Sequence, residues 1–322
     1  MKTPSLDELP DPPAGQTGWP WTEASDRLPE TMEDGSAWPR ISIVTPSYNQ
    51  GALIEETIRS VLLQRYPRLE YIVIDGGSDD ETVEILEKYD QWIDYWVSES
   101  DEGQSAAINK GFDWASGRYG SWINSDDWLC QGALVNHAQQ VGFSENRLYA
   151  GICLVHEGET LTRQHSTNIR TLEDLVRLPE YWRASDEQAH IVQPETLFPI
   201  EAFRAVGGLN PENHYTMDFE LWGKMMVHGL TVEATDVEYG AFRKHEDQKT
   251  SDQGRTTNSL VEKSHEIISL CPSWSAEKKE RLHSVIDSYE RYLWKRSGRL
   301  ARTSLPRGIV KTIREIKKHL VE

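Results

Sequence analysis

Two acidic residues, Asp126 and Asp127, stand side by side in the stretch SWINSDDWL. Adjacent carboxylates repel each other, so such a pair shares a proton, caps a helix or binds a cation. One interpretation is that Asp126 begins the next helix. A third acid, Asp75 in VIDGGSDD, ends another apolar run and favours the cation. Carboxylate oxygens suit Mg²⁺ or Mn²⁺, which keep substrate phosphates as further ligands, so the acids predict a substrate with a diphosphate group.

The elements that must position these acids alternate between strand and helix. Apolar, β-rich runs alternate with segments whose apolar residues fall on one helical face. The expected strands are 41–48, 69–77, 93–100 and 119–124, and the expected helices between them are 51–64, 79–90 and 103–117. Repeated βαβ units predict a parallel sheet with helices on both faces, and ligands bind at the carboxyl ends of such strands. The acids are therefore expected on one rim.

Composition and motifs exclude several classes of protein. The 322 residues carry a formal charge of −18, which opposes binding to nucleic acid. No G-x-G-x-x-G follows the first strand and no P-loop occurs, so the common nucleotide fingerprints are absent from the sequence. Three widely spaced cysteines, with no signal peptide and no apolar run of about 20 residues, predict a cytoplasmic protein with reduced thiols.

The two ends of the chain differ from the middle. Residues 1–39 hold seven of the fifteen prolines and three tryptophans, which predicts an extended arm packed on the domain. Residues 291–322 hold ten Lys or Arg against two acids, and their apolar residues share a helical face. Two interpretations of this basic tail stay open: a helix docked on its own domain, or peripheral contact with an anionic membrane.

Several motifs occur together in one order. TPSYNQ, VIDGGSDDET, SESDEGQSAAINKGF and WINSDDW, followed by QPETLFPIEAFRAVGGLN, MDFELW and FRKHEDQKTS, resemble family 2 glycosyltransferases of the GT-A fold over about residues 41–251. The resemblance implies a Rossmann-like, mostly parallel α/β sheet with helices on both faces and a C-terminal helical extension. It also implies transfer of a sugar from a nucleoside diphosphate, most commonly UDP, with inversion and with Mn²⁺ or Mg²⁺. The expected divisions are 1–39 for the arm, 40–148 for the donor half, 149–255 for the acceptor half and 256–322 for the extension.

The donor-binding residues follow from the resemblance position by position. Tyr48 is expected to pack on the nucleobase and Asp75 to hydrogen-bond its edge. Asn124 stands where the family's D-x-D motif has its first acid, so it contributes a hydrogen bond but no charge. For Lys110 a solvated helix lysine is an equal alternative. The full expected set is Pro46, Tyr48, Asp75, Asp101, Gly103, Gln104, Asn109, Lys110, Asn124 and Ser125.

The metal ligands are expected among three residues. Asp126 matches the second acid of the D-x-D motif and is the principal ligand, with Asp127 in support. His245 matches a histidine that relatives present to the metal or diphosphate, and an imidazole ligand would favour Mn²⁺. The plain alternative for His245 is a surface residue in a polar loop.

The acceptor side is expected to carry the general base. The stretch YTMDFELWGKMMVHG predicts a helix with Asp218 in its first turn, where the helix dipole would keep the carboxylate ionised. The resemblance gives Asp218 the role of base, and the plain alternative is an ordinary first-turn acid. Glu220, two residues further on, would point away from that spot. Gln193, Glu195 and His214 are weaker acceptor-site candidates.

The expected acceptor is a carbohydrate or a lipid-linked sugar in surface polysaccharide or glycolipid synthesis. Two other functions stay open. A sugar nucleotidyltransferase would ordinarily carry a Gly- and Lys/Arg-rich loop after the first strand, which TPSYNQGA lacks. A catalytically silent carbohydrate-binding or scaffold protein is supported by Asn124 in place of an acid.

Overall fold

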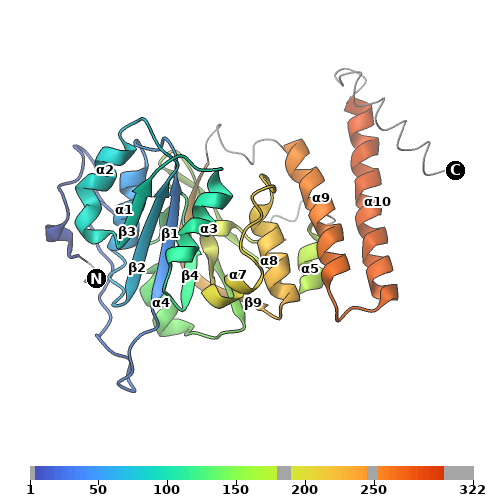
Figure 1. Ribbon diagram of the computed structural model, residues 1–322, viewed down its shortest axis with the longest axis horizontal. Coiled ribbons are helices and arrows are strands. Elements are labelled where there is room, and N and C mark those ends of the chain that lie inside the picture. Colours follow the sequence, from blue (N-terminus) through green and yellow to red (C-terminus); the bar gives the residue numbers. More distant parts are fainter. Residues whose placement is uncertain (1–3, 180–189, 245–252, 301–322) are drawn as a thin grey trace.

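A computed structural model describes residues 4–179, 190–244 and 253–300. Its centre is a nine-stranded sheet in the order β3-β2-β1-β4-β8-β6-β9-β5, with β7 paired to β6 (Figure 1). The strands are β1 (Ile41–Ser47), β2 (Leu69–Asp75), β3 (Tyr95–Ser98), β4 (Tyr119–Trp122), β5 (Trp128–Leu129), β6 (Arg147–Glu157), β7 (Thr160–Ser166), β8 (Thr196–Pro199) and β9 (Thr231–Lys244). Strands β1 to β4 are mutually parallel, whereas β8 is antiparallel to both of its neighbours. The expected α/β fold class is confirmed.

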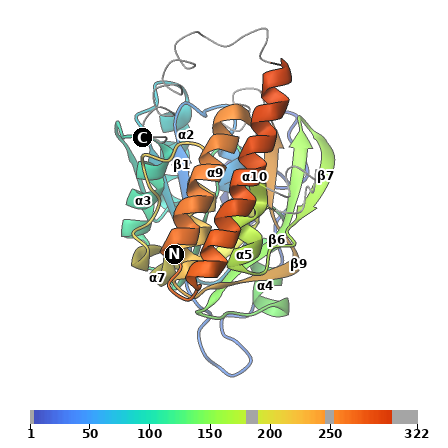
Figure 2. The same cartoon turned by 90° about the vertical axis from the view of Figure 1, so that its right-hand side faces the viewer.

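Helices cover both faces of the sheet. They are α1 (Ile54–Leu62), α2 (Thr82–Tyr89), α3 (Gln104–Trp114), α4 (Ala133–Gln140), α5 (Leu172–Val176), α7 (Ile200–Ala205), α8 (Met217–Val227), α9 (Gln253–Leu270) and α10 (Ala276–Leu300), with short 3-10 turns η1 (Leu6–Glu8), η2 (Asp90–Trp92) and η3 (Gln193–Glu195). The expected C-terminal helical extension is present as α9 and α10, which run side by side at one end of the molecule (Figures 1 and 2). None of the described helices is long and apolar enough to span a bilayer.

Side chains of one strand supply two separate cores. Ile41 and Ile43 of β1 pack with α1, α2 and α4 on one face, whereas Val44 packs with α3 on the other. Strand β2 alternates in the same way, because successive strand residues point to opposite faces. Burial on both faces explains why apolar residues of these strands point to both sides of the sheet.

The N-terminal arm is fixed to α1 by one buried arginine. The Arg59 guanidinium donates to the carbonyl oxygens of Pro10 at 2.8 Å, Pro20 at 3.1 Å and Trp21 at 2.8 Å. Trp19 of the arm also donates its indole N–H to the carbonyl of Leu129 in β5. The arm therefore packs on the domain, as its prolines and tryptophans predict.

The acidic pair differs from one expectation. Ser125 and Asp126 lie in a turn and the short strand β5 follows, so the interpretation that Asp126 begins a helix is wrong. The three cysteines are buried free thiols, as expected. The basic tail from residue 301 onward lies outside the described residues, and the proposed divisions of the chain stay predictions.

A buried acid, Glu195, lies in the η3 turn beside β7. The Glu195 carboxylate contacts His165 Nδ1 of β7 at 2.8 Å and accepts the N–H of Val192 at 3.1 Å. Burial raises the pKa of Glu195 to about 7, although the contact with His165 opposes this rise. The folded protein thus binds this proton more tightly than the unfolded chain, whose carboxyl titrates near 4.5.

We predict that Arg59→Met lowers the free energy of unfolding by about 3 kcal/mol, because three buried carbonyl oxygens lose a charged donor. Urea unfolding measures this change, and limited proteolysis should show faster cleavage within residues 4–39. Arg27→Met is the matched control, since Arg27 is exposed and forms a surface ion pair with Glu30. Equal stability of the Arg59 and Arg27 variants would contradict this role of the arginine.

We predict that Glu195→Gln changes the pH dependence of stability. The contribution of a carboxyl with a raised pKa is complete below about pH 4.5 and is lost as the pH rises through about 7. The stability of the variant relative to the wild type should therefore rise by about 1 kcal/mol per pH unit from about pH 5 to pH 7. Urea unfolding across this range measures it, with exposed Glu159→Gln as the control; a constant difference would contradict the raised pKa.

Candidate active site

The ends of three parallel strands bring polar side chains together. Ser47, Asp75 and Ser98 are direct neighbours across β1, β2 and β3. Asp75 is fully buried; its carboxylate accepts the hydroxyls of Ser78 at 2.5 Å and Ser98 at 2.6 Å, and the N–H of Ser78 at 2.8 Å. Asp75 thus ties the loop after β2 to β3. The Ser47 hydroxyl is buried and has no hydrogen-bond partner among the described residues. Ser47 was not among the expected donor-binding residues.

An aromatic ring and a carboxylate face each other across Gly76. A Cβ atom on Gly76 would lie 3.3 Å from the Tyr48 ring and 3.3 Å from both carboxylate oxygens of Asp101. Tyr48 is 63% exposed, and Asp101 is held by the N–H of Gly103 at 2.8 Å. Gly103 itself has φ +107°, in the region that favours glycine. Tyr48 and Asp101 therefore pack closely against Gly76, and the exposed part of the Tyr48 ring is accessible to a flat group.

A chain of hydrogen bonds joins the acidic pair to both sides of the rim. Gln104 at the start of α3 donates to Asn124 Oδ1 at 2.8 Å. Asn124 donates to Asp127 Oδ2 at 3.3 Å, and Asp127 Oδ1 accepts the N–H of Arg243 in β9 at 2.9 Å. Asn124, which replaces the first acid of the D-x-D motif, thus binds both Gln104 and Asp127.

Arg243 is a residue of the rim that the sequence motifs did not single out. Its guanidinium donates to the Asp126 carbonyl at 3.1 Å, pairs with Glu56 of α1 at 2.6 Å and lies 4.7 Å from the centre of the Trp128 ring. The only available signal was its place two residues before His245 in FRKHEDQKTS. Arg243 therefore fixes the backbone of the acidic turn.

A second fastening of the acidic turn comes from α1. The Thr57 hydroxyl lies 3.0 Å from the carbonyl oxygen of Ser125 and 2.6 Å from that of Asp127. Ser125 is buried, and these contacts involve its backbone. The turn is thus held from α1 and β9 together.

The two acids have different surroundings. Asp127 is 1% exposed, and burial together with the nearby charge of Asp126 raises its pKa well above the ordinary value. Asp126 is half-buried. In the described ranges, no group of three or more His, Cys, Asp or Glu side chains is arranged to hold a metal ion. Mg²⁺ and Mn²⁺ commonly take one or two protein carboxylates and complete their shell with phosphate oxygens, so one accessible acid, Asp126, fits such an ion. His245 lies outside the described residues.

The candidate base lies at the start of α8. Asp218 is half-buried in the first turn, and its carboxylate accepts the N–H of Phe219 at 2.8 Å. Burial raises the pKa of Asp218 above its ordinary value, while that hydrogen bond lowers it less. The helix dipole alone therefore does not set the charge of Asp218, because burial raises its pKa.

Consecutive residues of α3 contact both the acidic turn and α8. Gln104 holds Asn124, and the Ser105 hydroxyl lies 3.0 Å from the sulfur of Met217, the residue before Asp218. The first turn of α3 therefore lies between the two groups of candidate residues.

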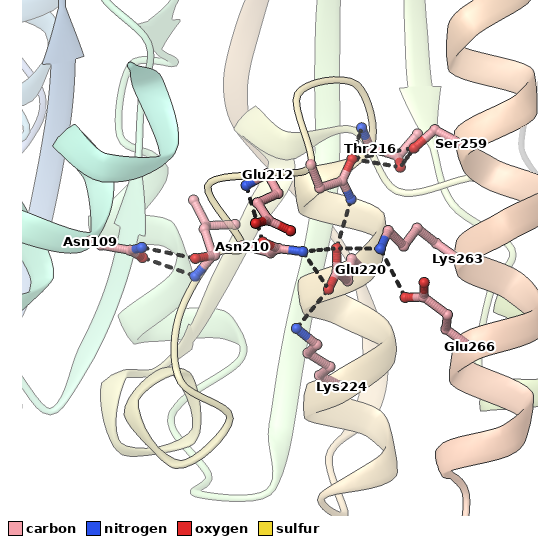
Figure 3. A network of polar contacts seen from close by, with 11 residues as sticks. Asn109, Asn210, Glu212, Thr216, Glu220, Lys224, Ser259, Lys263 and Glu266 are labelled. Carbon is pink, nitrogen blue, oxygen red and sulfur yellow. Dashed lines mark hydrogen bonds and ion pairs between the residues drawn. The ribbon is translucent and has the colours of Figure 1, made fainter. Parts of the chain in front are cut away.

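Glu220 belongs to a structural network instead of the rim. Its carboxylate accepts the side-chain N–H of Asn213 at 2.8 Å and pairs with Lys224 at 2.7 Å, and Lys263 of α9 lies 3.6 Å away (Figure 3). Burial would raise the pKa of Glu220, but Lys224 and Asn213 outweigh it and lower the pKa. Glu220 thus points away from the site, as its spacing from Asp218 predicts.

Two residues of the expected donor set have other partners in the structure. Both ends of the Asn109 amide bind the backbone of Leu209, at 2.8 and 2.9 Å, and so fasten the loop before α8 (Figure 3). Lys110 forms a surface ion pair with Glu99. Their roles in donor binding stay predictions, and so does that of Pro46, which lies in β1.

The weaker acceptor candidates are separated by burial. His214 is exposed in the loop before α8. Glu195 is fully enclosed against His165, which gives it a partner inside the protein. Gln193 is buried at η3, and its side-chain N–H donates to the carbonyl of Trp122 at the end of β4.

Solved structures share this architecture. The fold is similar to that of residues 1–349 of TarS from S. aureus in complex with UDP-GlcNAc, with a TM-score of 0.61 and 16% identity, covering 78% of this chain and 72% of that one. It is also similar to the mannosyltransferase PcManGT from Pyrobaculum calidifontis, in complex with GDP-Man and Mn²⁺, with a TM-score of 0.57 and 17% identity, covering 92% and 84%. These TM-scores support a shared fold, the GT-A type expected from the motifs.

Curated relatives match by sequence over shorter stretches. A GalNAc(5)-diNAcBac-PP-undecaprenol beta-1,3-glucosyltransferase of Campylobacter jejuni is 32% identical over 132 residues, 40% of this chain and 42% of the relative. The putative teichuronic acid biosynthesis glycosyltransferase TuaG of Bacillus subtilis is 41% identical over 92 residues, 28% of this chain and 36% of the relative. The matches thus span less than half the length of these relatives.

A sequence profile covers more of the chain than either relative does. The profile described as glycosyl transferase family 2 matches residues 42–206, just over half of the 322 residues. This stretch contains β1 to β4, the acidic turn and η3, the elements from which most of the rim is built. The chain therefore belongs to glycosyl transferase family 2.

Proposed function

We propose that this protein is an inverting glycosyltransferase that moves a sugar from a nucleoside diphosphate, UDP in our proposal, to a hydroxyl acceptor. The observation that carries the proposal is the first turn of α3. Gln104 holds the acidic turn through Asn124, and the next residue, Ser105, contacts the start of the helix that carries Asp218. Direct transfer between two substrates requires that both are held close together. The acidic turn, proposed for the sugar donor, and Asp218, proposed for the acceptor, both lie beside this turn of α3.

The donor's nucleobase is proposed to lie beside the Tyr48 ring. Gly76 allows the Tyr48 ring and the Asp101 carboxylate to approach each other closely, and this carboxylate is a hydrogen-bond acceptor for base or ribose. The buried Ser47 hydroxyl supplies a further polar atom at the same strand end. Aromatic stacking together with a few directed hydrogen bonds is the usual chemistry of a nucleotide site.

The diphosphate is proposed to lie against the acidic turn. Asp126 would hold the divalent ion, with Asp127 fixing the turn through the N–H of Arg243, and a bound ion supplies positive charge that stabilises the departing phosphate oxygens. Asn124 binds the Asp127 carboxylate and Arg243 binds the Asp126 carbonyl, so the turn is held in place before substrate binds. Preorganised groups of this kind act without reorganisation during the reaction.

Asp218 is proposed as the general base. It takes the proton of the acceptor hydroxyl while that oxygen forms a bond to the anomeric carbon. The bond from this carbon to the diphosphate breaks on the opposite face, and its electron pair leaves with the diphosphate. A carboxylate whose pKa is raised by burial is a stronger base than an exposed one, which suits this step.

The acceptor class is proposed from the relatives. One is named for a lipid-linked oligosaccharide and another for teichuronic acid, so we propose a bacterial-type surface polysaccharide or glycolipid acceptor. Such an acceptor would be met at the cytoplasmic face of a membrane, and the ten basic residues of the tail offer charge for contact with anionic lipid.

A catalytically silent protein of this fold is the second candidate, favoured by Asn124 in place of an acid. The two candidates differ in whether a metal ion links the protein to the nucleotide.

We predict that Mn²⁺ strengthens UDP binding by the wild type and that Asp126→Asn weakens this metal-dependent binding at least 10-fold, because the ion loses its charged ligand. Calorimetry with UDP, with and without Mn²⁺, measures both effects. Asp113→Asn, an exposed acid of α3, is the matched control. Binding by the wild type without any response to Mn²⁺ would favour the silent protein.

We predict that Asp218→Asn lowers kcat about 100-fold or more with little change in UDP binding, since only proton removal is lost. Glu220→Gln, altered two residues away, should lower stability but retain kcat in the folded fraction, because Glu220 belongs to the buried network. Product formation from a panel of nucleotide sugars, followed by mass spectrometry, gives the rates. Full activity of Asp218→Asn would assign the base to another residue.

A further inference from the structure

Gln193 presents a buried hydrogen-bond acceptor without a partner. The residue is 8% exposed, and its Nε2 donates to the carbonyl of Trp122. Its Oε1 contacts no donor among the described residues. A buried acceptor that has lost its water and gained no partner costs free energy, so such atoms usually serve a ligand or ordered water.

The orientation of this amide is fixed by its neighbours. The Trp122 carbonyl can only accept, so the amide must turn its nitrogen to it and its oxygen away from the end of β4. The η3 turn is held by the Thr196 hydroxyl, which donates to the Gln193 carbonyl at 2.8 Å. Glu195, bound to His165 and to the N–H of Val192, anchors the same turn from beneath.

A close contact behind the turn also resists movement. A Cβ atom on Gly240 of β9 would lie 2.4 Å from the carbonyl oxygen of Pro194, so only glycine allows this approach. Gln193 therefore lies on a turn that is held by Thr196, by Glu195 and by close packing against Gly240.

The same part of the molecule carries the proposed base. The rings of Trp122 and Trp222 stack with their centres 5.5 Å apart and planes 23° apart. Trp222 lies one helical turn after Asp218, and residues at this spacing share a face of the helix. Gln193 and Asp218 are thus each linked to one of the two stacked tryptophans, Gln193 to Trp122 and Asp218 to Trp222.

We propose that Gln193 is a specificity-determining residue whose Oε1 accepts a hydrogen bond from an acceptor-sugar hydroxyl adjacent to the hydroxyl that reacts. This inference rests on the proposed function. An amide oxygen can only accept, so the ligand group must be a donor; a sugar that is deoxygenated or O-methylated at this position leaves the buried oxygen unpaired. Sites built to hydrogen-bond a hydroxyl discriminate strongly against analogues that lack it.

The test compares acceptors that differ in one hydroxyl. Methyl glycosides of glucose, galactose and N-acetylglucosamine, each with its monodeoxy analogues, are offered to the full chain with a nucleotide sugar that it hydrolyses. The wild type should prefer the parent glycoside over one deoxy analogue by about 100-fold in kcat/KM. Gln193→Met, which has similar length and no amide, should reduce this preference to less than about 5-fold, because transfer to the parent glycoside loses more rate than donor hydrolysis does.

A second variant covers the case in which Gln193→Met folds poorly. Gln193→Glu retains an acceptor oxygen, and its buried carboxyl in the protonated form also retains a donor for the Trp122 carbonyl, so this variant should retain the preference for the parent glycoside. Persistence of the full preference in Gln193→Met, or equal loss of donor hydrolysis and transfer, would overturn the proposal. Failure of the proposed function itself is distinguishable, since then the wild type would hydrolyse none of the nucleotide sugars.

Discussion

The hydrogen-bond chain from Gln104 through Asn124 and Asp127 to Arg243 is the interaction on which the site depends. It joins residues more than 100 positions apart and crosses the change from parallel to antiparallel pairing in the sheet. Because Asp127 is buried and committed to this chain, Asp126 is the acid of the pair that stays accessible. Asp127 fastens the turn, and Asp126 is the acid that we propose for the metal ion.

Features distant from the rim support the same turn. The N-terminal arm supplies carbonyl oxygens to Arg59 of α1, and Thr57, on the same helix, lies against the backbone of Ser125 and Asp127. A segment that carries no proposed substrate contact is thus linked to the acidic turn through one helix. The loop before α8 has a similar support, since Asn109 and Glu220 hold it from α3 and α8.

Much of the fold follows from the sequence because strand and helix periodicity is local. The first four strands, the helices between them and the common rim were predictable, since Ser47, Asp75 and Ser98 each end a strand of the same parallel sheet. The inward role of Asp127 was not predictable, because its partner Arg243 is distant in sequence. The raised pKa of Asp218 likewise depends on burial by α3 and its neighbours, which no local pattern specifies.

We propose different tasks for Asp126 and Asp127: Asp126 binds a metal-bound diphosphate, and Asp127 binds the protein itself. A crystal structure with UDP and Mn²⁺, with the ion located by its anomalous scattering, tests this most directly. We expect manganese in direct contact with an Asp126 carboxylate oxygen and the diphosphate, with Asp127 still bound to the N–H of Arg243. Manganese absent from Asp126, or UDP bound away from Tyr48 and Gly76, would contradict it.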